Sequence, residues 1–173
     1  MIKDESKNKD FRVTIFGSSR IKKNDPIYID VKSLTKMLGE KGIDVVTGGG
    51  PGIMMAANEG HTIGQKNSPH KSHSIGLLIQ LPREQKANKF LDISKNYDRF
   101  SNRLDNFMIL TNVFVIAPGG IGTTLEFFYA LQLIQTKQTC NTPIILMGEM
   151  WPDLIRWMEK WPLKNKFINS EDL

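Results

Sequence analysis

Residues 113–126 read VFVIAPGGIGTTLE, five apolar residues followed by a glycine-rich turn and the start of an expected helix. An apolar run without polar alternation is typical of a strand in a parallel sheet that is covered on both faces. Two earlier segments begin in the same way, residues 11–19 (FRVTIFGSS) and residues 43–54 (IDVVTGGGPGIM). Each places a turn of small residues directly after a short β-prone run, which predicts strands that lead into helices.

The rest of the chain continues this alternation. Pro26 is expected to open a helix with Asp25 as its N-cap, and this helix should end before Gly42. Further helices are predicted at residues 53–59, 100–110, 124–137 and 150–160, and further strands at residues 74–81 and 143–147. Strands that alternate with helices predict an α/β fold, a Rossmann-like three-layer α/β/α arrangement with a mainly parallel sheet.

Two segments between these elements are less regular. Residues 61–73 are polar and basic, so they are expected to form a loop in which His61, His70 and His73 are surface residues. Residues 82–98 carry mixed signals, and neither a helix nor a strand is predicted there.

The composition is that of one folded domain. The 173 residues are 40% hydrophobic and 24% charged, which excludes a disordered chain, and no apolar run approaches the ~20 residues that span a bilayer. The single cysteine, Cys140, cannot form an intrachain disulfide and is expected to be structural. Residues 1–10 show no signal peptide and are expected to be a flexible N-terminus. We therefore expect residues 11–173 to form a single Rossmann-like nucleotide-binding domain, cytoplasmic and not bound to a membrane.

The charge balance leaves two kinds of partner open. Lysine and arginine total 23 against 18 acidic residues, a formal net charge of +5. The basic residues are scattered and form no long run with interleaved aromatics, so a nucleic-acid partner is not expected. A small anion such as a phosphate, or a mildly basic surface with no partner, accounts for the charge equally well.

The glycine-rich turns favour a phosphate ligand. Turns at residues 17–19, 48–52 and 119–123 follow parallel strands, so they should meet at one edge of the sheet, where ligands bind. Glycine lets successive N–H groups converge on an anion, and a helix N-terminus adds its positive dipole. The P-loop is not matched, because Ile53 and Met54 follow Gly52 where that motif needs lysine and serine or threonine. A mononucleotide or sugar phosphate is therefore preferred to NAD.

A family resemblance follows from these motifs. Residues 118–126 (PGGIGTTLE) fit the P-G-G-x-G-T-x-x-E signature, and the chain resembles the LONELY GUY (LOG) proteins over about residues 11–161. These are nucleoside 5′-monophosphate phosphoribohydrolases, often mislabelled lysine decarboxylases. The other matching blocks, in the same order, are residues 16–20 (FGSSR), 47–54 (TGGGPGIM), 81–85 (LPREQ), Arg103 and 133–137 (LIQTK). The resemblance implies that the N-glycosidic bond of AMP or of a cytokinin riboside 5′-monophosphate is hydrolysed to free base and ribose 5-phosphate.

The resemblance also implies site residues. Arg103 and Glu126 match the family's catalytic pair, and Glu84 matches a glutamate that contacts the substrate. The other expected substrate-binding residues, from the turns and the helices after them, are Gly17, Ser18, Gly49, Gly50, Gly52, Met54, Gly119, Gly120, Gly122, Thr123 and Thr124. No cofactor and no metal are expected. The chain departs from the family's usual residues at Leu104, Leu125, Tyr129 and Gln132.

Two interpretations of Glu126 remain open at this point. As a catalytic carboxylate it would stabilise positive charge on the ribose, with Arg103 lowering its pKa and keeping it ionised. Alternatively, Thr123 and Glu126 have the spacing of a capping box, which would serve the helix alone.

Two expectations concern the whole molecule. The first is an alternative function, a non-catalytic carrier of a nucleotide or of the molybdenum cofactor with the same fold, which would need the glycines but not the carboxylate. The second is a homodimer, because the helices at residues 124–137 and 150–160 are too apolar for the surface of one small domain. Trp151, Trp157 and Trp161 would then lie in the core or at the subunit interface.

Overall fold

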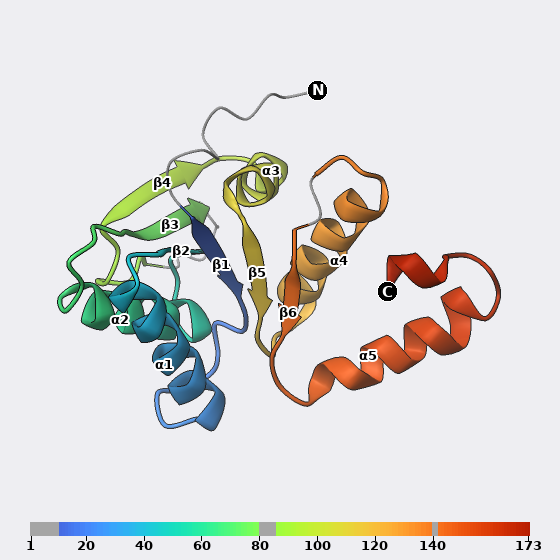
Figure 1. Ribbon diagram of the computed structural model, residues 1–173, viewed down its shortest axis with the longest axis horizontal. Helices are drawn as coiled ribbons and strands as arrows, with labels where there is room; N and C mark the ends of the chain where they lie inside the picture. The colour runs from blue at the N-terminus through green and yellow to red at the C-terminus, as the bar shows by residue number, and fades with distance from the viewer. Residues whose placement is uncertain (1–10, 80–85, 140–141) are drawn as a thin grey trace.

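A computed structural model describes residues 11–79, 86–139 and 142–173, and its centre is a sheet of six parallel strands (Figure 1). The strands are β1 (Arg12–Phe16), β2 (Asp44–Thr47), β3 (Ser74–Ile79), β4 (Ile93–Tyr97), β5 (Val113–Ile116) and β6 (Ile144–Leu146). They lie in the order β4-β3-β2-β1-β5-β6, and every neighbouring pair is parallel. The strand order reverses direction beside β1, where Thr14 pairs with Val46 of β2 on one side and Phe114 of β5 on the other.

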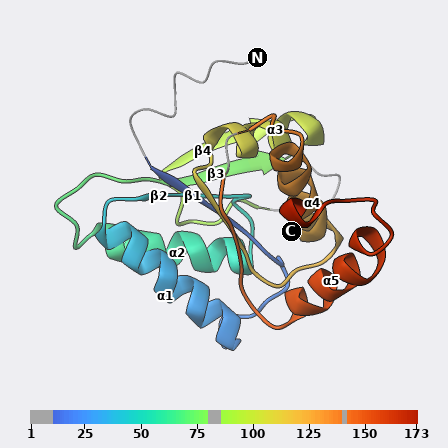
Figure 2. The ribbon, with the colours of Figure 1, turned by 45° about the vertical axis from the view of Figure 1, so that its right-hand side comes forward.

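Helices cover both faces of this sheet (Figure 2). They are α1 (Pro26–Glu40), α2 (Ile53–Gln65), α3 (Phe100–Leu110), α4 (Ile121–Gln135) and α5 (Met150–Met158). Val13 and Ile15 of β1 pack with α1 and α2, whereas Phe16 packs with the residues of α3, α4 and α5. Neighbouring strand residues thus serve opposite cores, which explains why the strands carry no polar alternation. The expected Rossmann-like three-layer α/β/α fold is confirmed.

The first helix begins as its sequence predicts. Pro26 is its first residue, and the Asp25 carboxylate accepts a hydrogen bond from the Ile27 amide at 3.1 Å. A carboxylate in this place satisfies one of the amides that a helix start leaves without a partner, so the N-cap prediction is confirmed.

The second helix is longer than predicted. It continues past Gly60 to Gln65, because Gly60 and Gly64 lie where α1 crosses α2 and do not end the helix. A Cβ at either glycine would collide with a backbone carbonyl of α1, so glycine permits the close approach of the two helices. His61 is therefore fully buried, with Nε2 at 3.1 Å from the Ile43 carbonyl. The expectation of a surface histidine at position 61 is wrong, and burial lowers the pKa of this imidazole.

The edge strand β4 is an element that the sequence did not predict. Its residues, ISKNY, are exposed apart from Tyr97, because the strand pairs with β3 on one side only. An edge strand with so little burial has no hydrophobic pattern to reveal it.

The C-terminal part carries most of the exposed aromatic side chains. Trp151 of α5 is buried in the core, as expected, whereas Trp157 and Trp161 are about half exposed. After α5 the chain forms a π-helical turn at Glu159–Leu163. In the described ranges no helix is both long and apolar enough to cross a membrane.

Candidate active site

The three glycine-rich turns lie side by side, held by backbone hydrogen bonds. The Ser18 amide, after β1, donates to the Pro118 carbonyl after β5 at 3.0 Å. The Ser18 carbonyl in turn accepts from the amide of Ile53, the first residue of α2, at 2.9 Å. The expectation that turns far apart in sequence meet at the carboxyl edge of the sheet is confirmed.

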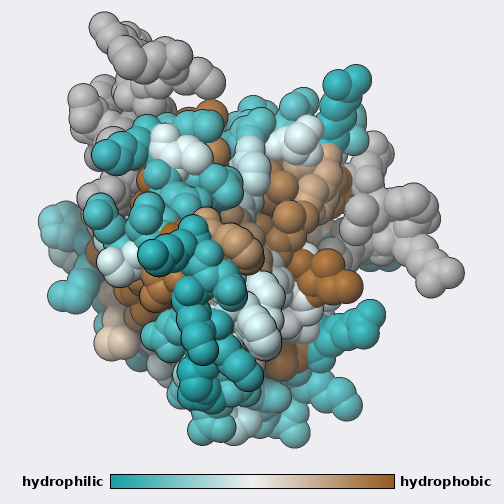
Figure 3. Space-filling view, turned by 90° about the vertical axis from the view of Figure 1, so that its right-hand side faces the viewer, coloured by the Kyte–Doolittle hydropathy of each residue, from teal (hydrophilic) through white to brown (hydrophobic). Residues whose placement is uncertain are grey.

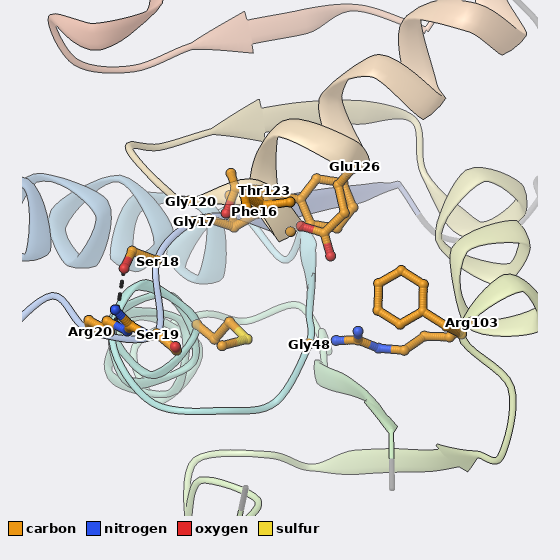
Figure 4. A pocket seen from close by; sticks show the side chains of 15 residues that line it. Phe16, Gly17, Ser18, Ser19, Arg20, Gly48, Arg103, Gly120, Thr123 and Glu126 are labelled. Atoms are coloured by element: carbon orange, nitrogen blue, oxygen red, sulfur yellow. Dashed lines mark hydrogen bonds between the residues drawn. The ribbon is translucent and has the colours of Figure 1, made fainter. Parts of the chain in front are cut away.

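A cavity of about 520 Å³ opens at this edge, beside β1 where the strand order reverses. This is the position at which open α/β sheets bind ligands. Eight residues predicted for the site line it: Gly17, Ser18, Met54, Arg103, Gly120, Gly122, Thr123 and Glu126 (Figure 4). Seven further lining residues were not predicted from the sequence: Ile15, Phe16, Ser19, Arg20, Gly48, Phe100 and Ile121.

Five predicted residues do not line the cavity: Gly49, Gly50, Gly52, Gly119 and Thr124. Gly49 and Gly52 have positive φ values of +72° and +66°, and any Cβ there would collide with Leu78 or with the backbone of residues 18–19. These glycines are therefore needed for the course of the chain. Gly119 lies against Thr123, and the Thr124 hydroxyl donates to the Gly120 carbonyl at 3.1 Å. Glu84 and Cys140 lie outside the described residues.

The N-terminus of α4 forms one wall of the cavity. Gly120 is its N-cap, and among the described residues no side-chain hydrogen bond caps this helix start. Those amides and the helix dipole favour an anion. A Cβ at Gly120 or Gly122 would meet nothing within 4 Å, and neither glycine has a positive φ. Neither the fold nor the backbone conformation requires glycine here, and the open space beside the amides is free for a ligand.

The capping-box interpretation of Glu126 is wrong. Thr123 is the third residue of α4 and not its N-cap, and Glu126 lies a full turn deeper in the helix. The carboxylate therefore cannot reach the amides that a capping box would satisfy.

Arg103 enters the cavity from α3 and is only 8% exposed. Its Nε donates to the Leu77 carbonyl of β3 at 2.6 Å. Its guanidinium carbon lies 5.1 Å from the ring centre of Phe107 and 5.9 Å from that of Phe100, on the same helix. Burial lowers the pKa of this guanidinium and the carboxylate of Glu126 opposes that effect. Arginine stays charged at neutral pH in spite of such burial.

Glu126 is 9% exposed, and its side chain points into the same cavity as the Arg103 guanidinium (Figure 4). Burial raises the pKa of its carboxyl from 4.5 to about 7, and the charge of Arg103 offsets only part of that rise. Arg103 lowers the pKa of Glu126 as expected, but it does not keep the carboxyl fully ionised at neutral pH, because desolvation is the larger effect. No ion pair between the two side chains forms in the described part of the chain. A carboxyl group that titrates near neutral pH suits proton transfer.

The raised pKa predicts a pH-dependent gain of stability in Glu126→Gln. In the unfolded chain the carboxyl ionises near pH 4.5, and in the fold it ionises near pH 7. As the pH rises between these two values, the carboxyl therefore ionises in the unfolded chain before it ionises in the fold. Glu126 thus lowers the free energy of unfolding over this pH range. At pH 8 the substitution should raise the free energy of unfolding by up to about 3 kcal/mol, with little change at pH 4. Urea unfolding at both pH values measures this, and an equal effect at the two would contradict it.

Fold and cavity define an α/β protein in which an uncapped helix N-terminus and the buried carboxyl group of Glu126 line one cavity. The sequence model of the family described as "Possible lysine decarboxylase" matches residues 54–173, and the chain belongs to this family. This confirms the family resemblance seen in the motifs. A curated relative, "Pyrimidine/purine nucleotide 5'-monophosphate nucleosidase" of Escherichia coli (strain K12), is 28% identical over 147 residues. The alignment covers 79% of this chain but 30% of that protein, so the chain spans about a third of its relative's length.

Solved structures share the fold. The X-ray structure of TM1055, a structural genomics target, is similar with a TM-score of 0.65 and 23% identity, over 93% of this chain and 87% of that one. The molybdenum cofactor binding protein from the phototrophic bacterium Rippkaea orientalis has the same TM-score of 0.65 with 19% identity, over 88% and 85% of the two chains.

Proposed function

We propose that this protein hydrolyses the N-glycosidic bond of a nucleoside 5′-monophosphate, such as AMP, to free base and ribose 5-phosphate. The observation that carries the proposal is that Glu126 and the uncapped amides of its own helix face one cavity. Glu126 lies four residues after Gly122, about 6 Å along the helix axis. A phosphate bound at the amides would therefore hold its ribose beside the carboxylate. The activity of the Escherichia coli relative agrees with this proposal.

The residues suit the steps of this reaction. The C1′–N bond breaks and its electron pair leaves with the base, which takes up a proton from the solvent, while positive charge develops on the ribose. The Glu126 carboxylate stabilises that charge and accepts a proton from the water molecule whose oxygen bonds to C1′. Arg103 forms no ion pair with Glu126 in the described residues, and only its Nε is bonded, to the Leu77 carbonyl, so its two Nη groups can donate to a ribose hydroxyl or phosphate oxygen.

A panel of nucleotides tests the proposal. AMP, GMP, CMP, UMP and isopentenyladenosine 5′-monophosphate are incubated with the protein, each beside its nucleoside, and free base and ribose 5-phosphate are measured. We expect base release from at least one monophosphate and none from its nucleoside, because only the monophosphate reaches the α4 amides. Equal cleavage of nucleoside and nucleotide would contradict the phosphate site, and no cleavage of any monophosphate would contradict the activity.

The carrier of a nucleotide or molybdenum cofactor is the second candidate, because one solved structure with this fold binds that cofactor. A carrier would use the same amides of α4, but it has no need for a buried carboxyl group with a raised pKa. Tight binding of a panel nucleotide without its cleavage would favour the carrier.

The homodimer stays a prediction. Figure 3 shows the face of the molecule on which α4 and α5 lie, and apolar side chains gather there between hydrophilic ones. The exposed apolar residues of this part of the chain include Leu125, Ile145, Met150, Trp157 and Trp161. A second copy covering them would remove an apolar surface that a monomer leaves in water.

A further inference from the structure

Asn88 forms hydrogen bonds to the loop between β2 and α2, residues 48–52, from outside the cavity. The Asn88 amide donates to the Gly49 carbonyl at 2.8 Å. Its side-chain Nδ2 donates to the Gly50 carbonyl at 3.0 Å and to Oδ1 of Asn58 at 2.9 Å. One residue thus contacts two consecutive carbonyls of the loop, and Asn88 does not itself line the cavity.

Asn58 connects this contact to the sheet. It is fully buried in α2, accepts a hydrogen bond from the Thr47 hydroxyl at 2.9 Å, and donates to the Ser74 hydroxyl at 2.8 Å. Thr47 ends β2 and Ser74 begins β3, and the Thr47 hydroxyl also accepts from the Gly49 amide at 2.9 Å. The network is buried and its members satisfy one another, which makes it a rigid support for the loop.

The other side of the loop touches Arg103. Gly48 lines the cavity, and a Cβ at this position would collide with Nη2 of Arg103 and lie 2.8 Å from the sulfur of Met54. The Gly48 backbone is therefore in close contact with the guanidinium (Figure 4). Any shift of the loop changes the space in which the guanidinium lies.

We infer that Asn88 is a positioning residue, which holds the loop so that Gly48 confines the Arg103 guanidinium at its place opposite Glu126. The inference rests on the proposed function for its effect on catalysis. Its geometry does not depend on that function, because the contacts join Asn88, the loop and Arg103 without a ligand.

The position of Arg103 can be measured through Glu126. Among the described residues, Arg103 is the charged group that shifts the pKa of the Glu126 carboxyl. The pKa of Arg103 is in turn shifted by Glu126 and Tyr97. Arg20 lines the far side of the cavity (Figure 4). Arg103 holds the pKa of Glu126 below the value that burial alone would give. A guanidinium that moves away should therefore let this pKa rise.

The test is Asn88→Leu, which removes the side-chain donors, keeps the number of side-chain non-hydrogen atoms and adds no charge, with Asn88→Ser as a smaller variant. The matched control is Asn106→Leu, because within the described residues the Asn106 side chain is bonded only to the Asn102 carbonyl of its own helix. We expect kcat for AMP to fall about tenfold with KM within about twofold, since the α4 amides are untouched. The acid limb of the pH profile of kcat should also move to higher pH. A purely structural role would lower the active fraction without moving that limb.

A second readout separates this inference from the proposed function. Carbon NMR titration of the Glu126 carboxyl, assigned with Glu126→Gln, reports its pKa in a protein that need not turn over AMP. In Asn88→Leu or Asn88→Ser this pKa should rise by about 0.5 or more, and in the control it should not. An unchanged pKa overturns the inference, whether or not AMP is cleaved. If the wild type releases no base, the proposed function fails by itself.

Discussion

Glu126→Gln is expected to abolish base release from AMP and to leave AMP binding intact. The amide keeps the shape of the protonated carboxyl but can neither accept a proton nor offset the positive charge of the ribose. General-base and electrostatic contributions of this kind are each worth about 10²- to 10⁴-fold, so kcat should fall at least about 1,000-fold. The dissociation constant of AMP, measured by calorimetry, should stay within about threefold, because the α4 amides are unchanged.

Glu40→Gln is the matched control for this experiment. Glu40 ends α1 on the surface, where it pairs with Lys36 at 3.7 Å, and its neutralisation should change neither kcat nor binding. Normal turnover in Glu126→Gln would remove Glu126 from the chemistry. Lost turnover together with lost AMP binding would instead make it a binding residue.

Gly122→Ala is expected to weaken AMP binding without weakening the fold. A Cβ at Gly122 meets no protein atom within 4 Å, so the methyl group would occupy the space beside the α4 amides that the phosphate needs. Overpacking of this kind costs about 1–3 kcal/mol, which corresponds to a rise in KM of about 5- to 150-fold. The free energy of unfolding should be equal or higher, because alanine favours a helix more than glycine does.

Gly119→Ala provides the contrast, because a Cβ there would collide with the side chain of Thr123. That variant should lose stability, whereas Gly122→Ala should not. Thermal unfolding and AMP titration of both variants separate the two effects. Unchanged AMP binding in Gly122→Ala would show that the phosphate does not bind at this helix start.

The parts of the fold that the sequence predicts well are those under strong local constraint. Buried strands such as β5 have uninterrupted apolar runs, and the turns after them are made of small residues, so both could be located and brought to one edge. The edge strand β4 could not be located from the sequence, because four of its five residues face solvent. Gly60 was interpreted as a helix end, since its contact with α1 is a tertiary feature with no local signal.

The candidate site was predicted in outline, but its energetics required coordinates. Glycine can serve either the ligand or the chain itself, and only the surroundings show that Gly122 borders open space while Gly49 and Gly52 have positive φ. The pKa of Glu126 depends on the balance between burial and the charge of Arg103. The sequence identified the two charged groups, but the extent of burial follows from packing around α4.

The crystal structure of the Glu126→Gln variant with AMP bound gives the most direct test of the central claim. We expect the phosphate on the backbone amides at the start of α4 and C1′ within about 4 Å of the substituted side chain at position 126. A phosphate bound elsewhere, or a side chain at position 126 that faces away from the ribose, would contradict it.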